Sequence, residues 1–167
     1  MIPSAQTLAE LTAQLNLEFQ AIEENWELNT QAWQRIQEGA SHQLDWSALG
    51  YTLHTVYTAM ENYFLRICKA FENNLPTESG HRELLQRMEL EIPGLRPALL
   101  DRETARALDQ LRAFRHVFRN LYDDRLDPER LTILQRRAGA VRGAFQAAHV
   151  RYLERLADLA LSSGSEG

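Results

Sequence analysis

Apolar residues recur at steps of three and four along most of the chain, which is the repeat of an amphipathic α-helix. In residues 4–38 the pattern meets no internal proline or glycine. Its apolar positions are Leu8, Leu11, Leu15, Phe19, Ile22, Trp26 and Trp33. The same pattern returns from about residue 45 to 73, with Leu49, Leu53, Val56, Tyr57, Met60, Phe64 and Ile67. The spacing predicts two long helices, the second capped at its N-terminus by Asp45 or Ser47.

Breaks in the pattern divide the rest of the chain. The segment ENNLPTESGH ends the second helix, and a short helix is predicted over 81–89. The segment IPGLRP (92–97) predicts a rigid turn because it holds two prolines and a glycine. A third long helix is predicted over 101–124. Asp127 followed by Pro128 is typical of an N-cap and a first helical residue, so a fourth long helix is expected over 128–161.

These elements predict an all-α protein. β-branched residues are few, and no Asn-Gly or Asp-Gly hairpin turn occurs. Four long helices with short connections fold most simply as an antiparallel up-and-down bundle of four to five helices, with 81–89 as an insertion. A chain of 167 residues fits one domain, expected over 1–161, and the final SSGSEG (162–167) is expected to be a disordered tail.

The sequence does not indicate a membrane-spanning or a secreted protein. No apolar run approaches the roughly 18 residues that cross a bilayer, and the start MIPSAQTLAELTAQ is unlike a secretory signal. We therefore expect a cytoplasmic protein that makes no membrane contact. Cys68 is the one cysteine, which excludes an internal disulfide and a thiolate metal cage. Its place in an apolar pattern predicts a core thiol.

Charge is unevenly distributed along the chain. The net charge of −5 argues against broad nucleic-acid binding. Residues 112–155, however, hold ten arginines and five acidic residues, so this segment carries +5 and the remainder −10. Lys69 is the one lysine among the 18 basic residues. Arginine suits bidentate contact with phosphate, although a codon preference accounts for the bias equally well.

The segment FRHVFRNLY (114–122) carries the densest candidate chemistry. Helical spacing places Arg112, Arg115, Arg119 and Tyr122 on one ridge beside an apolar stripe of Leu108, Leu111, Phe114, Phe118 and Leu121. His116 lies within reach of two of these guanidinium groups, and nearby positive charge favours a neutral imidazole that accepts a proton. Such a group and such cations are what RNA cleavage without a metal requires. Alternatively, the arginines pair with acidic residues of the first helix and His116 lies in solvent.

Other catalytic and metal sites are not indicated. The five histidines form neither an HExxH motif nor a pair at i and i+4, and no GxSxG elbow occurs. His54 and Glu61 share a helix face, where a buried hydrogen-bonded pair is a better interpretation than a pair of metal ligands. We expect no metal and no cofactor.

At this point the chain resembles the HEPN superfamily, and more closely its HepT-like proteins. The superfamily motif is Arg, four to six residues and His, which HepT members extend to Arg-x4-His-x-Tyr. Arg115, Asn120 and Tyr122 fall on that frame, with Asn120 where the family has its histidine. The resemblance extends over LHTVYTAMENYF (53–64), HRELLQRM (81–88), IPGLRPALL (92–100) and FRHVFRNLYDDRLDPERL (114–131).

The resemblance implies a helical-bundle ribonuclease toxin, encoded beside a minimal nucleotidyltransferase antitoxin. It implies a homodimer in which the motifs of two subunits meet around one RNA phosphate. Arg112, Arg115 and Arg119 would hold the phosphate, His116 or Asn120 would deprotonate or position the hydroxyl, and the partner would adenylylate Tyr122. Because asparagine cannot transfer a proton near neutrality, a catalytically inactive dimer that binds a partner or RNA is the alternative.

Overall fold

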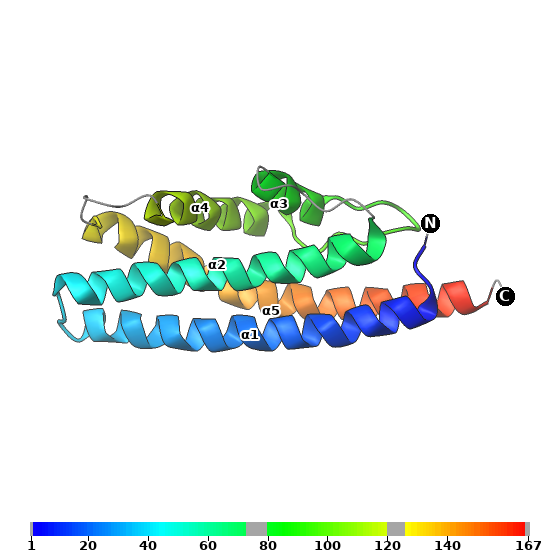
Figure 1. Ribbon diagram of the computed structural model, residues 1–167, viewed down its shortest axis with the longest axis horizontal. Coiled ribbons are helices and arrows are strands. Elements are labelled where there is room, and N and C mark those ends of the chain that lie inside the picture. The colour runs from blue at the N-terminus through cyan, green and yellow to red at the C-terminus, as the bar shows by residue number, and fades with distance from the viewer. Residues whose placement is uncertain (1, 73–79, 120–125, 166–167) are drawn as a thin grey trace.

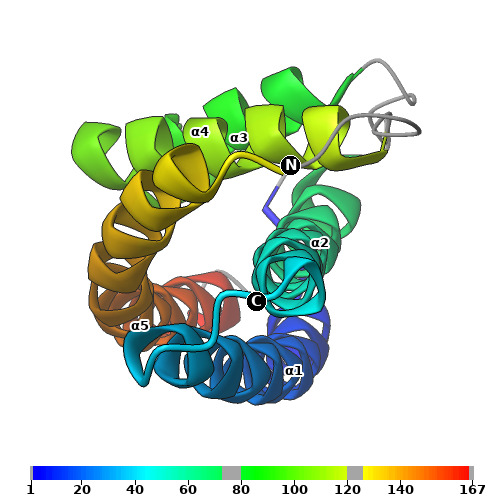
Figure 2. The same cartoon turned by 90° about the vertical axis from the view of Figure 1, so that its left-hand side faces the viewer.

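The computed structural model describes residues 2–72, 80–119 and 126–165. They form five helices: α1 (Ala5–Gln37), α2 (Gln43–Phe71), α3 (His81–Glu89), α4 (Arg102–Arg119) and α5 (Pro128–Gly164). Successive long helices run in opposite directions, and α3 lies beside the start of α4 (Figure 1). Seen from one end, α1, α2, α4 and α5 surround a common axis (Figure 2). The described residues therefore confirm the predicted all-α, antiparallel up-and-down bundle.

Capping residues explain where the helices begin. The Asp127 side chain accepts a hydrogen bond from the Glu129 N–H at 3.0 Å, and Pro128 is the first residue of α5, as predicted. The N-cap predicted for α2 is wrong, because the helix begins earlier. There, His42 Nδ1 accepts from the Leu44 N–H at 3.1 Å, and Asp45 accepts from the His42 N–H at 3.2 Å. Asp45 thus completes a capping box and is not the cap itself.

The C-terminal end of α5 differs from the prediction, and the predicted end of α4 lies outside the described residues. α5 continues to Gly164, three residues past its predicted end. The hydroxyl groups of Ser162 and Ser163 donate to the carbonyls of Asp158 and Ala160, at 3.1 and 3.0 Å, so both side chains are hydrogen-bonded within the helix. α4 is described to Arg119, and the rest of its predicted span, 120–124, lies outside the described residues.

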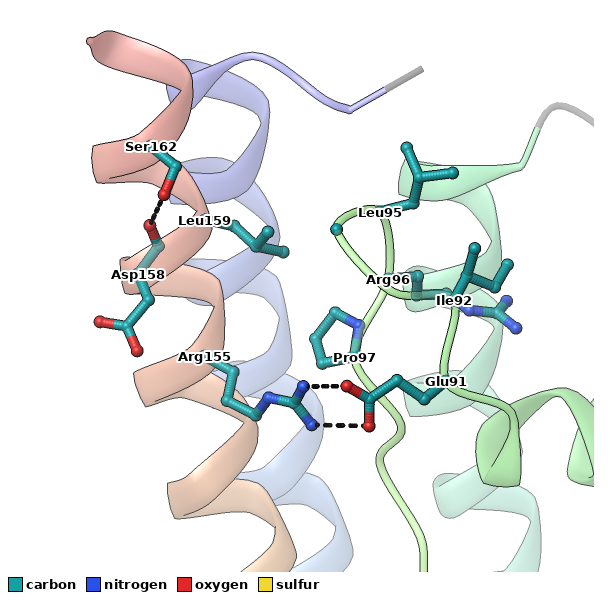
Figure 3. A pocket seen from close by; sticks show the side chains of 10 residues that line it. Glu91, Ile92, Leu95, Arg96, Pro97, Arg155, Asp158, Leu159 and Ser162 are labelled. Carbon is teal, nitrogen blue, oxygen red and sulfur yellow. Dashed lines mark hydrogen bonds and ion pairs between the residues drawn. The ribbon is translucent and has the colours of Figure 1, made fainter.

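The segment between α3 and α4 makes the predicted turn. The backbones of Ile92 and Arg96 exchange hydrogen bonds of 2.8 and 2.9 Å, and Gly94 has a positive φ of 73°, which glycine adopts without strain. A pocket of about 250 Å³ lies between this turn and α5 (Figure 3). Across it, Arg155 forms a double ion pair with Glu91, at 2.5 and 3.3 Å. Because the turn also places Leu99 and Leu100 in the core, it fixes the position of α3 relative to α4.

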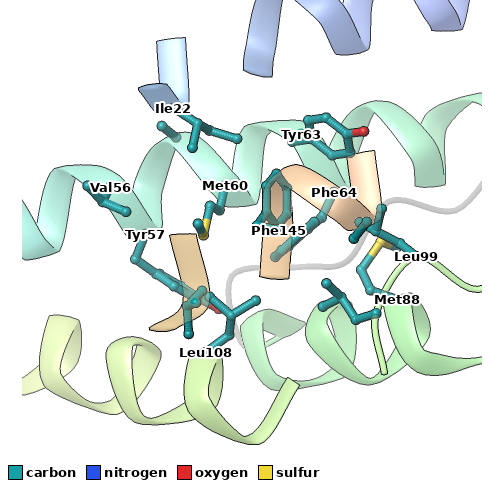
Figure 4. Close-up of a cluster of buried hydrophobic side chains, with 14 of the residues drawn as sticks. Ile22, Val56, Tyr57, Met60, Tyr63, Phe64, Met88, Leu99, Leu108 and Phe145 are labelled. Carbon is teal, nitrogen blue, oxygen red and sulfur yellow. The ribbon is translucent and has the colours of Figure 1, made fainter. Parts of the chain in front are cut away.

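One hydrophobic core joins all five helices (Figure 4). The ring of Phe145, on α5, packs edge-on against Tyr63 of α2, with ring centres 5.3 Å apart. Residues from the other three helices, including Ile22, Met88 and Leu108, complete this region. Cys68 is fully buried, which confirms the predicted core thiol, and burial raises its pKa. Within the described residues, no helix combines the length and apolar character needed to cross a bilayer.

Several of the buried polar side chains are hydrogen-bonded to one another within this core. The amides of Asn29 and Gln135 exchange hydrogen bonds of 2.9 and 2.7 Å between α1 and α5, and Asn29 also donates to Thr52 at 3.0 Å. His149 bonds through Nδ1 to the Tyr63 hydroxyl at 2.8 Å and stacks on Phe19, with ring centres 4.1 Å apart. Satisfied buried groups of this kind cost little, whereas unpaired ones are expensive.

The buried His149 predicts an acid-sensitive fold. Burial lowers its pKa below the ordinary value, so the unfolded chain takes up this proton before the folded chain does. The contribution of His149 is therefore complete above about pH 6.5 and decreases as the pH falls below that value. We expect the free energy of unfolding, measured by urea denaturation at about pH 7.5 and about pH 5.5, to decrease less in His149→Gln than in the wild type. An equal decrease in both proteins would contradict this assignment.

Candidate functional site

The buried face of α4 contains an arginine. Arg115 follows the buried Leu108 and Leu111 at steps of seven and four, so it continues their face into the bundle. Its side chain is only 12% exposed. Neighbouring turns of α4 pack closely on α2: a Cβ added to Gly50 would lie 3.2 Å from Phe118 and 3.4 Å from Phe114. This close approach holds the last turns of α4 against α2 and places Arg115 between the helices.

The acidic partner of Arg115 is Glu61 of α2. Its side chain is 6% exposed, and its Oε1 atom forms an ion pair with Nη1 of Arg115. Its second oxygen, Oε2, lies 2.6 Å from Nδ1 of His81, the first residue of α3. One buried carboxylate therefore joins three helices, and its two oxygens bind one basic side chain each.

These side chains border a surface pocket of about 570 Å³. Helix α4 contributes Arg115, His116 and Arg119, while His81 comes from α3. The other described residues that line it are Thr58, Glu61, Asn62, Leu65, Gly80 and Leu84. A volume of this size is within the range that binds a nucleotide-sized ligand.

The two arginines of the pocket have different environments. Burial, followed by the nearby charge of Arg119, lowers the pKa of the Arg115 guanidinium, which nevertheless stays well within the charged range. Arg119 is exposed, as is His116. Arg119 therefore presents a solvent-accessible positive charge, while Arg115 presents a positioned one.

The structure brings together three of the predicted site residues: Arg115, His116 and Arg119. Arg112 does not line the pocket, and its Nε atom donates to Asp109 at 2.7 Å on the same helix. The alternative prediction, that the arginines pair with the first helix, is wrong for Arg112 and Arg115, whose acidic partners belong to α4 and α2. Asn120 and Tyr122 lie outside the described residues, and their roles stay predictions.

The predicted pairing of His54 with Glu61 is wrong. Residues seven apart share a helix face but lie two turns, about 10 Å, from each other, and Glu61 is engaged with Arg115 and His81 instead. Nδ1 of His54 is buried and has no hydrogen-bond partner among the described residues, and its ring centre lies 5.7 Å from that of Phe118. Burial, and then the charges of Arg115 and Arg119, lower the pKa of His54.

His81 is not among the site residues predicted from the sequence, and the partner predicted for Glu61 is wrong. One signal was present in the sequence: Glu61 directly follows the apolar Met60 on a helix whose neighbouring positions are buried. An acidic residue there requires a basic partner. Which partner it binds is decided by tertiary packing, since His81 is 20 residues away and Arg115 is 54.

Two further observations compare this pocket with other candidate sites. The pocket beside the 92–97 turn is lined by Arg96 and Arg155, which pair with Glu72 and Glu91, respectively. Figure 3 shows the pair of Arg155 with Glu91. This pocket therefore has less positive charge to offer an anion.

In the described part of the chain, no three His, Cys, Asp or Glu side chains lie close enough together to hold a metal ion.

A family comparison assigns the chain. The model of the HepT-like protein family matches residues 48–156, which is well over half of the sequence. The chain belongs to the HepT-like proteins. Comparisons with curated proteins and with solved structures gave no match. The matched region of this HepT-like protein begins inside α2 and ends inside α5, so it contains all the described residues that line the pocket and leaves out α1.

The burial of the Glu61–Arg115 pair predicts a large stability difference between two arginines of α4. Arg115→Met would leave the Glu61 carboxylate buried with only His81, which should lower the free energy of unfolding by about 3 kcal/mol. The matched control is Arg112→Met, because the Asp109 side chain is 42% exposed. That change should cost about 1 kcal/mol or less.

Urea denaturation of the two variants measures this difference. Adding Glu61→Gln to Arg115→Met should recover part of the loss, because the neutral amide is less costly to bury than the carboxylate. Equal losses for Arg115→Met and Arg112→Met would show that the Glu61–Arg115 pair is not a buried interaction.

Proposed function

We propose that this HepT-like protein is a metal-independent endoribonuclease, the toxin of a HEPN/minimal-nucleotidyltransferase toxin–antitoxin pair. The observation that carries the proposal is the pocket at which Arg115 of the family motif lies together with Arg119 and two histidines. Family membership supports the toxin–antitoxin assignment. The pocket chemistry supports RNA as the substrate.

The arginines suit an RNA phosphate. Arg119 is exposed and its guanidinium can donate two parallel hydrogen bonds to phosphate oxygens. Arg115 is fixed by Glu61 at the inner side of the pocket, so its charge needs little reorganisation when a phosphate becomes more negative in the transition state. Exposed Asn62 adds an amide that can bind a ribose or a base.

Cleavage uses the 2′-hydroxyl of the RNA itself. A base removes its proton, the 2′ oxygen attacks the adjacent phosphorus, and the bond from phosphorus to the 5′ oxygen breaks. The products are a 2′,3′-cyclic phosphate and a 5′-hydroxyl whose proton comes from water. His81 and His116 both line the pocket and are the described residues that can accept the first proton. The charge on the phosphate is balanced by the arginines.

Control by the partner follows from the same site. Tyr122 is three residues after Arg119 in the sequence. An adenylate on its hydroxyl would add a negative phosphate and a bulky nucleoside near the arginines, and would compete with RNA. In a homodimer the pockets of two subunits would face one RNA strand, as in the family arrangement.

A second candidate function is a catalytically inactive dimer that binds its protein partner or RNA. The Asn120 substitution favours this alternative, because the family has its histidine at that position. The neutralisation of Arg115 by Glu61 also favours it, since a paired guanidinium attracts an anion less strongly.

Incubation of the purified protein with total RNA in EDTA distinguishes these functions. We expect cleavage products ending in 2′,3′-cyclic phosphate, and activity reduced at least about 100-fold in Arg119→Ala and in Arg115→Ala. Circular dichroism at the assay temperature must show that both variants are folded. The control is Arg136→Ala, an exposed arginine of α5 that does not line the pocket, which should retain full activity.

Intact RNA at high wild-type concentration would contradict the ribonuclease proposal. If the same protein then bound RNA with an affinity that decreased with salt, the binding-module alternative would be supported. Cleavage that persisted in both arginine variants would place the active site elsewhere.

A further inference from the structure

We propose that His81, from the short helix α3, is the catalytic base of this ribonuclease and that Glu61 is its positioning residue. This inference rests on the proposed function and adds the group that replaces the missing motif histidine. It assigns the reaction to a side chain outside the Arg-x4-Asn-x-Tyr segment. The site would then combine a base from α3 with phosphate-binding arginines from α4.

The contact with Glu61 fixes the imidazole. Nδ1 of His81 lies 2.6 Å from Oε2 of Glu61, which is within hydrogen-bond distance. The carboxylate only accepts hydrogen bonds, so Nδ1 carries the proton in this contact. In the neutral ring, Nε2 is then the atom with a free lone pair. A carboxylate that holds one imidazole nitrogen and leaves the other able to accept a proton is the arrangement found in catalytic triads.

His81 is also accessible to a substrate. Its side chain is 44% exposed and lines the pocket together with Arg115 and Arg119, while Glu61 is 6% exposed. The base therefore faces the ligand, and the residue that orients it is shielded from water. The buried Leu84, Leu85 and Met88 hold α3 in the core, so the backbone of His81 is anchored by its own helix.

The same carboxylate joins the base to a phosphate-binding residue. Oε1 of Glu61 pairs with Arg115 and Oε2 binds His81, so the relative positions of the two side chains are set by one group. Among the described residues, Glu61 thus joins Arg115 to a histidine of α3, whereas the exposed His116 lies on the same helix as Arg115. A defined distance between base and phosphate site is a large part of what makes intramolecular attack fast.

In the proposed step, Nε2 of His81 takes the proton of the 2′-hydroxyl as the 2′ oxygen bonds to phosphorus. The 5′ oxygen leaves with the electron pair of its bond to phosphorus and takes a proton from water. Glu61 stays ionised and stabilises the imidazolium that forms. The imidazolium then returns its proton to the hydroxide left by that water, which restores the neutral ring.

The test compares cleavage of a single-stranded RNA by three full-length proteins in EDTA. His81→Ala should reduce the rate by about 100- to 10,000-fold, the usual contribution of a general base. Added imidazole should restore part of the lost rate, because a small base can occupy the vacated space. His42→Asn is the control: it changes a histidine outside the pocket to another good N-cap and should cleave at the wild-type rate.

The outcomes separate the base from the ribonuclease. Wild-type-like cleavage by His81→Ala, or loss in a folded His81→Ala that imidazole does not restore, would overturn the assignment of His81 while the proposed function stands. Absence of cleavage by the wild type would overturn both. Nitrogen NMR gives a readout that does not depend on activity: the neutral His81 ring should carry its proton on Nδ1, and a ring protonated mainly on Nε2 would overturn the proposal.

Discussion

The site depends on a single buried carboxylate. Glu61 lies inside the bundle, where an unpaired charge would cost several kcal/mol. Because this carboxylate needs basic partners, Arg115 of α4 and His81 of α3 both contact it at the same point on α2. The hydrophobic core would bring these helices together without Glu61, but it would not determine which polar side chains meet at their junction. The pocket of this HepT-like protein is therefore organised by electrostatics within a hydrophobic scaffold.

This arrangement gives the three arginines of α4 different surroundings. Arg115 occupies the buried face and is held in place, Arg119 is exposed and available to a ligand, and Arg112 is paired with Asp109 outside the pocket. The three arginines look equivalent in the sequence, but each lies in a different environment in the structure. The close packing of Phe114 and Phe118 at Gly50 sets this division, because it determines which side of α4 faces α2. The buried ion pair and the exposed positive charge of the pocket thus belong to different residues of one helix.

Most of the fold was predictable from local patterns, and most of the site was not. The three- and four-residue repeat and the Asp127–Pro128 signal identified the helices because these features act within a few turns. His42 escaped prediction since histidine is an uncommon N-cap. The ridge of Arg112, Arg115 and Arg119 was read from helical geometry alone, which does not say how deeply each position is buried. The contact of Glu61 with His81 joins two separate helices, so no repeat in the sequence predicts it.

The exchanged amide hydrogen bonds of Asn29 and Gln135 have a consequence for how α1 is attached. Apolar stripes on two long helices tolerate an axial slip of one turn, because one leucine replaces another in the same groove. Here such a slip would leave two desolvated amides without complements. The pair therefore fixes the axial position of α1 relative to α5. Helix α1 lies outside the region matched by the family, and this contact holds it in one register against the rest of the bundle.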